Sequence, residues 1–191
     1  MNIRALIASA LMVVVPAALP ADMPGWVTAA PDNAGFTAEF PSAPQRQVTN
    51  KPSVSSTIWL ATAPDGNIKV LVGVTDYWAD IDTQKEMDLD EKNFVEAVAA
   101  KTTSSKRDPF PGASKKHALL PSSVFEFQTA SGWSGRSRVI VDGNTAYQTV
   151  VMWPSAYIAS TALESFENSF KLLPRVRPAP PASTAAPAAG K

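Results

Sequence analysis

RSRVIVDGNTAYQTVVMW, residues 136–153, is the stretch that decides the fold. Two runs rich in β-branched residues flank Asp142-Gly143-Asn144, and this pattern predicts a tight antiparallel hairpin. A two-residue turn at Asp142-Gly143 or Gly143-Asn144 pairs even-numbered residues before it with odd-numbered residues after it. One face of the hairpin is then predicted to be core, because its apolar residues include Val139, Val141, Ala146, Val150 and Met152.

The opposite face of this hairpin combines arginines with aromatic residues. It is predicted to hold Arg136, Arg138, Tyr147 and Trp153, together with Ile140, Thr149 and Val151. An arginine over an aromatic ring gains about 0.5–2 kcal/mol, so these four residues form the candidate binding surface for a ligand or partner. The alternative is that a helix covers this face and the arginines reach its rim, because a sheet of this kind usually needs both faces covered.

Strand patterns continue on both sides of the hairpin. Alternating or β-branched runs predict strands over residues 35–40, 55–61, 68–77 and 124–129, and Asp65-Gly66 predicts a second hairpin. A capping box from Asp88 to Glu91 predicts the start of a first helix, which should fade by residues 102–105. A second helix is expected to open at Thr161. These elements do not alternate as in a βαβ repeat, so the fold class is α+β, a mostly antiparallel β-sheet flanked by helices.

The order of these landmarks resembles a known family. GFTAEFP, residues 35–41, is followed by Pro44, and LESFENSFKL, residues 163–172, closes the domain. The chain is similar in these motifs to small exported bacterial proteins with a PsbP-like fold, over Phe36 to Leu172. The resemblance implies an α/β/α sandwich and almost no chemistry. Family members with known roles are non-catalytic accessory or assembly factors, and no functional residue can be carried over.

The two ends differ from the middle. Residues 1–21 place Arg4 before an apolar run, residues 5–15, which Pro16 ends. This layout is typical of a signal peptide, and the run is too short to span a bilayer, so we expect a periplasmic or secreted protein. A single domain is expected over residues 22–173. Residues 174–191, rich in Pro and Ala, are predicted to be a disordered tail whose removal after Pro174 leaves stability unchanged.

The amino-acid composition argues against several classes of partner and binding site. Lys+Arg and Asp+Glu number 17 each, so nothing favours nucleic acid as a partner. One His and no Cys argue against a zinc site, and no cofactor motif occurs. Residues 76–91 hold seven carboxylates without an EF-hand pattern, so a solvated acidic loop is expected there. The basic residues around 101–116 are expected to be a solvated linker, with an irregular loop over 108–112.

These observations favour an exported, soluble protein that binds a partner or ligand and does not catalyse a reaction. The leading hypothesis is a non-catalytic accessory or partner-binding factor of the cell envelope, with a protein partner, no cofactor and no membrane span in the mature chain. Two alternatives stay open: a small-molecule carrier and a carboxylate-based hydrolase. The specific function is not indicated by the sequence.

Overall fold

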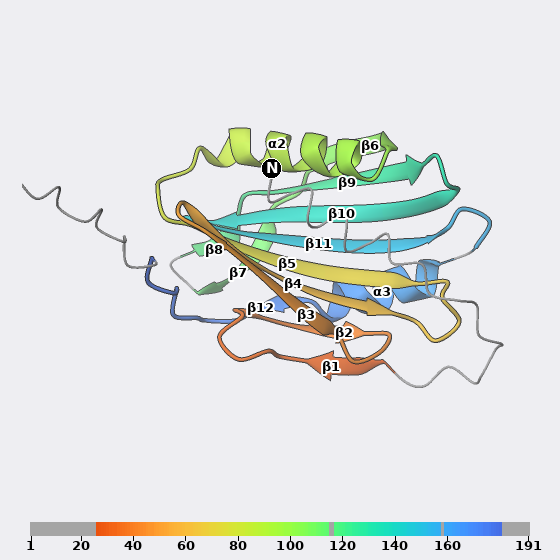
Figure 1. Ribbon diagram of the computed structural model, residues 1–191, viewed down its shortest axis with the longest axis horizontal. Helices are drawn as coiled ribbons and strands as arrows, with labels where there is room; N and C mark the ends of the chain where they lie inside the picture. Colours follow the sequence, from red (N-terminus) through yellow and green to blue (C-terminus); the bar gives the residue numbers. More distant parts are fainter. Residues whose placement is uncertain (1–25, 115–116, 158, 181–191) are drawn as a thin grey trace, which may run out of the picture.

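Antiparallel sheet dominates the structure (Figure 1), a computed structural model that describes residues 26–114, 117–157 and 159–180. The largest sheet has seven strands in the order β3-β4-β5-β11-β10-β9-β6, and every neighbouring pair is antiparallel. Its strands are β3 (Gln45–Lys51), β4 (Val54–Thr62), β5 (Lys69–Tyr77), β6 (Ala100–Arg107), β9 (Ser122–Thr129), β10 (Trp133–Asp142) and β11 (Thr145–Pro154).

Smaller elements cover the two faces of this sheet. They are the three-stranded sheet β1 (Val27–Ala29), β2 (Phe36–Phe40) and β12 (Lys171–Leu172), the hairpin β7 (Phe110–Ser114) and β8 (His117–Leu120), and the helices α2 (Thr83–Ala97) and α3 (Ser160–Ser169). Figure 1 shows α2 on one side of the large sheet and α3 with the three-stranded sheet on the other. The fold is therefore α+β and mostly antiparallel, richer in sheet than a balanced α/β/α sandwich.

Each face has its own apolar core. On the α2 side, the ring of Phe94 lies 5.0 Å from that of Phe127, edge to face. On the other side, Phe36 contacts Trp59 edge to face at 5.1 Å and stacks on Phe170 at 5.8 Å. Aromatic pairs of this kind add about 0.5–1.5 kcal/mol beyond the burial of their area. Among the described residues, no helix is long and apolar enough to cross a membrane.

The central hairpin has the predicted register. Asp142 pairs with Thr145, so the turn is Gly143-Asn144. Gly143 has φ 58°, a left-handed conformation that glycine adopts without steric cost and that type II′ turns require at their first central residue. Ile140 pairs with Tyr147 and Arg138 with Thr149, so the predicted sharing of faces is confirmed. The residues predicted as core are all buried.

Several elements were not predicted, and the exposed strands are the largest error. β6 replaces the expected linker after the first helix, and β7 occupies part of the expected irregular loop. β6 reads AKTTSSKR and is exposed along nearly its whole length. A strand at the edge of a sheet has no core face to fill, so its sequence lacks the apolar alternation by which strands are recognised. β1, β3, β8 and β12 were missed as well.

The helix starts also need correction. α2 begins at Thr83 with Asp82 as N-cap, whose side chain accepts a hydrogen bond from the Lys85 N–H at 3.0 Å. Asp88, the predicted cap, lies inside the helix, because Asp82 offers the same capping chemistry six residues earlier. α3 begins at Ser160, next to its N-cap Ala159, which makes no side-chain capping hydrogen bond.

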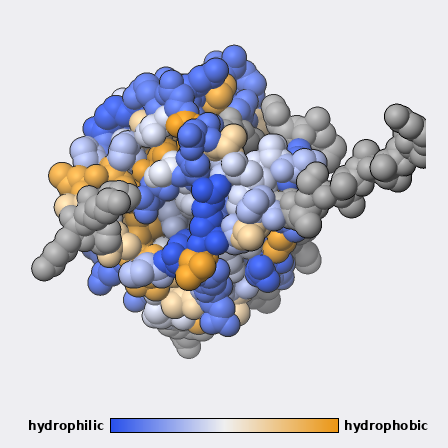
Figure 2. All heavy atoms as spheres, turned by 90° about the vertical axis from the view of Figure 1, so that its left-hand side faces the viewer, coloured by the Kyte–Doolittle hydropathy of each residue, from blue (hydrophilic) through white to orange (hydrophobic). Residues whose placement is uncertain are grey.

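The predicted tail begins too early. Leu173 N–H donates to the Gly35 carbonyl at 2.9 Å, and the Asn33 side chain exchanges two hydrogen bonds with the backbone of Val176. The Arg175 side chain, only 9% exposed, pairs with Asp76 at 2.6 Å. Residues 173–177 therefore pack on the domain. Figure 2 shows this end of the molecule, where a hydrophilic band runs between groups of hydrophobic atoms. Residues 1–21 and 181–191 lie outside the described part of the chain.

Candidate functional site

The four residues of the candidate surface share one sheet face, but the face is divided. Tyr147 is 3% exposed and belongs to the core under α3 and the three-stranded sheet, and Trp153 packs against the same core. The side chains of Arg136 and Arg138 remain 30% and 18% exposed. This arrangement agrees with the covered-face alternative, in which the aromatic residues lie under the covering elements and the arginines reach the rim.

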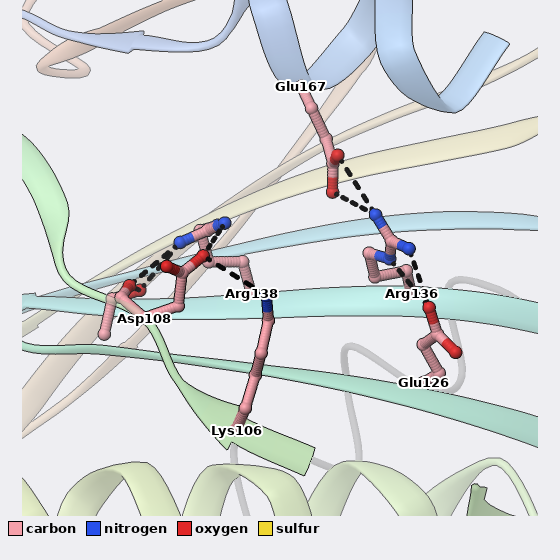
Figure 3. A network of polar contacts seen from close by, with 7 residues as sticks. Lys106, Asp108, Glu126, Arg136, Arg138 and Glu167 are labelled. Carbon is pink, nitrogen blue, oxygen red and sulfur yellow. Dashed lines mark hydrogen bonds and ion pairs between the residues drawn. The ribbon is translucent and has the colours of Figure 1, made fainter. Parts of the chain in front are cut away.

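Charged side chains from four elements meet at this rim (Figure 3). Arg136 donates to Glu126 Oε1 at 2.7 and 3.1 Å and to Glu167 at 3.1 Å. Arg138 donates to Asp108 Oδ2 at 2.8 Å, and Lys106 Nζ lies 4.0 Å from the same oxygen. We call this group the polar strip, and its members are Lys106, Asp108, Glu126, Arg136, Arg138 and Glu167.

Sheet register explains why these side chains meet. Arg136 and Arg138 are two residues apart on β10, so both point to the same face. Arg136 lies directly opposite Glu126 of β9. Asp108 follows the end of β6, and its backbone carbonyl accepts a further bond from Arg138 at 3.1 Å. Glu167 reaches the strip from α3, as Figure 3 shows.

The arginine–aromatic contact expected on this face forms with a different ring. The guanidinium carbon of Arg138 lies 5.3 Å from the centre of the Phe110 ring. Phe110 belongs to β7, a strand that was not predicted, and its own ring lies 5.7 Å from that of Phe170. Arg138 thus rests on the edge of the apolar core, with its charged end turned toward Asp108.

Two carboxyl groups of the strip, those of Asp108 and Glu126, are held ionised by the arginines. The hydrogen bond from Arg138 lowers the pKa of Asp108, and the hydrogen bond from Arg136 lowers the pKa of Glu126. Burial works against the charge of Arg136, but the bonds and charges of Glu126 and Glu167 outweigh it, and the pKa of Arg136 is raised. A general acid needs a pKa near the working pH. The pKa values of Asp108 and Glu126 are lowered, away from that range, which argues against such a role for either carboxyl group.

The acidic residues of the predicted loop turn to separate partners. Asp76 pairs with Arg175, Asp80 accepts from Asn144, Asp82 caps α2, Glu86 accepts from Tyr77, and Asp88 pairs with Arg107. Among the described residues, no three His, Cys, Asp or Glu side chains are placed to hold a metal ion. Arg107 and Lys106 of the basic cluster are engaged with carboxylates in the same way.

The sequence did not reveal the acidic partners of the strip. Glu126 had a usable signal, because it stands between Phe125 and Phe127 and alternation places it on the face opposite those rings. Glu167 and Asp108 had none. Asp108 lies 30 residues from Arg138, and Glu167 lies 31 residues from Arg136. Such contacts depend on how the elements pack.

Arg138→Ala is expected to destabilise the domain. The change removes three hydrogen bonds and the contact with Phe110. We expect a loss of about 1–2 kcal/mol at neutral pH, since the partly exposed Asp108 is screened by solvent. The pKa of Asp108 is lowered in the folded state, so its contribution is present above its unfolded pKa and fades as pH falls through the folded value. Urea unfolding at neutral and acidic pH measures both effects.

The matched control for this experiment is Arg107→Ala. Arg107 also pairs with a carboxylate, but the side chains of Arg107 and Asp88 are 40% and 59% exposed. Exposed pairs contribute about 0–1 kcal/mol, so this variant should stay close to the parent protein. Equal stability losses in the two variants, or no loss in Arg138→Ala, would contradict the assignment of Arg138 to the supporting structure of the rim.

Comparison with known proteins finds relatives in structure alone. No protein-family model and no curated protein matches the chain. A cyanobacterial PsbP from Synechocystis has a TM-score of 0.49 and 8% identity, over 77% of this chain and 92% of that one. A protein from Bacteroides thetaiotaomicron has a TM-score of 0.39 and 15% identity, over 76% of this chain and 47% of that one, so the match spans about half its length. The structural neighbours of this chain thus include a PsbP, the family that its motifs resemble, and neither likeness carries a statement about function.

Proposed function

We propose that this protein is an exported, non-catalytic accessory factor that binds a protein partner of the cell envelope. The order of Arg4, the apolar run over residues 5–15 and Ala21 supports export to the periplasm or the medium. We also assign its fold to the PsbP-like α/β/α sandwiches, on the motifs GFTAEFP at residues 35–41 and LESFENSFKL at residues 163–172.

The polar strip carries the proposal. Its three cations and three carboxylates form two neighbouring sets of ion pairs, one around Arg136 and one around Asp108, and their side chains are 18% to 70% exposed. Rigid, half-exposed charges of both signs are suited to recognition, because a partner with the complementary pattern gains specificity and a faster encounter. The lowered pKa values of Asp108 and Glu126 favour this role over acid catalysis by a carboxylate-based hydrolase.

Glu126→Gln is the variant that tests this function. Glu126 is 43% exposed, and Arg136 keeps its bond to Glu167 when the charge is removed. We expect the variant to melt near the parent temperature and to bind the partner about tenfold more weakly, as for loss of an interfacial charge. The exported chain is immobilised, captured envelope proteins are quantified by mass spectrometry, and binding is repeated with the purified partner.

The control for this capture is Glu96→Gln, which removes a carboxylate of α2 whose side chain is 64% exposed. Partner capture that survives Glu96→Gln and fails with Glu126→Gln supports the strip as the binding surface. Equal capture by both variants argues against it. The same cells test the location, because the N-terminus of the recovered chain should lie near Asp22, whereas an uncleaved cytoplasmic chain contradicts export.

A further inference from the structure

The two edges of the seven-stranded sheet differ in how far they are protected. β3 and β6 end the sheet, and within the described residues each is hydrogen-bonded to a single neighbouring strand. The outer side of an edge strand presents unpaired N–H and C=O groups, which can pair with another strand. Proteins usually block such edges with charges, bulges or a covering element.

β6 has all three kinds of protection. Its register against β9 shifts between Thr102 and Ser104, which marks a bulge or irregularity. α2 packs beside it, and Thr102 and Ser105 donate hydrogen bonds to Glu91 of that helix. The strand also carries lysines at positions 101 and 106. A further strand would have to displace or oppose these groups.

Within the described residues, β3 lacks the bulge and the covering helix that β6 has, and its two charges, Arg46 and Lys51, stand near its ends. Its seven residues pair with β4 without a register shift, from Gln45 opposite Leu60 to Lys51 opposite Val54. Its middle, residues 47–50, is uncharged, and Val48 at the centre is 47% exposed. A regular, exposed strand edge whose middle is uncharged and whose central residue is apolar is suited to accept another strand.

The sequence of β3 is also compatible with pairing to itself. In an antiparallel pair of two β3 strands centred on Val48, Arg46 lies opposite Asn50 and Lys51 lies opposite Gln45. The two valines lie opposite each other, and no cation faces a cation.

We propose that two copies of this chain associate through β3, which pairs with β3 of the second copy in antiparallel register about Val48. The contact is isologous, because the same edge of each copy forms both halves of a two-fold interface. The large sheet then continues from one copy into the other. A single strand pair falls below the roughly 1,200–2,000 Å² of a stable complex, so the dimer is weak and forms at high protein concentration. This inference does not depend on the partner-binding function.

Single cysteines test the pairing, since the chain has no cysteine of its own. Directly opposite residues of an antiparallel pair have Cα atoms about 4.5–5.5 Å apart, within the range that a disulfide can bridge. The exported Val48→Cys protein should therefore form a disulfide-linked dimer under mild oxidation about tenfold faster than a random encounter allows. Leu119→Cys is the control, because Leu119 is another exposed apolar strand residue, 67% exposed, away from β3.

The register supplies a second, independent measurement. Gln47 of one copy lies opposite Thr49 of the other, so a mixture of Gln47→Cys and Thr49→Cys proteins should cross-link faster than either protein alone. Val48→Lys should lower the association of the cysteine-free protein in sedimentation at high concentration, because it sets two ammonium groups opposite each other, whereas Val48→Thr should preserve it. Cross-linking of Val48→Cys at the rate of Leu119→Cys, or no preference for the mixed pair, would overturn the proposal.

Discussion

Phe166→Ala is expected to lower the free energy of unfolding by about 3–5 kcal/mol. Phe166 is 1% exposed, and its ring lies 6.4 Å from that of Phe40 and 6.2 Å from that of Phe170. Removing it leaves a cavity between α3, β2 and the large sheet. The helix has little to offset the loss, since its N-cap Ala159 makes no side-chain capping bond and its stability therefore depends on packing.

Urea unfolding of the parent and the variant at one temperature measures this effect. Glu164→Ala is the matched control, because Glu164 is an exposed residue of the same helix and alanine favours the helical state. The control should stay within about 0.5 kcal/mol of the parent. A loss of less than about 1 kcal/mol in Phe166→Ala would mean that the site collapses around the smaller side chain or that α3 does not dock as described.

Local patterns were enough to predict the centre of the fold. The turn at Gly143-Asn144 sets the parity of the hairpin, so its core face could be listed residue by residue. Phe166 and Phe170 stand four residues apart, the spacing of one helix face, and both are buried where α3 and its C-cap meet the core. These features depend on residues that are neighbours along the chain, and a period of two or of 3.6 residues encodes them directly.

The edges and the polar contacts could not be predicted in this way. β3 and β6 lack apolar alternation because neither has a buried face to fill. Glu167 and Asp108 meet the arginines through the packing of separate elements, and Phe110 meets Arg138 from a strand that follows a proline. The candidate surface was therefore predicted with its arginines in the right place and with the wrong aromatic partner.

The C-terminal segment makes a contact that its amino-acid composition does not predict. Arg175 stands in a Pro- and Ala-rich sequence, yet its guanidinium pairs with Asp76, 99 residues earlier. Asp76 also accepts a hydrogen bond from Thr145 at 2.8 Å. Gly35 allows the approach, because a Cβ atom there would lie 2.3 Å from Arg175 Cδ and 2.7 Å from the Tyr147 hydroxyl. Gly35 also has φ 77°, so a larger residue would both clash with these two side chains and adopt an unfavourable backbone conformation.

This pair connects the segment after β12 to the C-terminal end of β5 in the large sheet. The side chains of Arg175 and Asp76 are 9% and 6% exposed, so neither charge has much access to water. A buried pair contributes little compared with a well-packed apolar pair, but the loss of one partner is costly because the other charge stays buried without compensation. The position of Arg175 thus reverses the sequence-based expectation that the chain can be cut after Pro174 without effect.

Arg175→Ala is expected to lower the free energy of unfolding by about 3–5 kcal/mol, since it leaves the Asp76 carboxylate buried without its cation. A chain that ends at Pro174 should lose a similar amount, whereas one that ends at Pro180 should match the parent. Arg177→Ala is the control, because Arg177 is exposed and contacts the Trp78 ring at 5.3 Å. The double variant Asp76→Asn with Arg175→Met should recover part of the loss, because it removes both charges together. Urea unfolding of the five proteins beside the parent gives the ranking, and unchanged stability in Arg175→Ala would show that the segment does not hold the domain together.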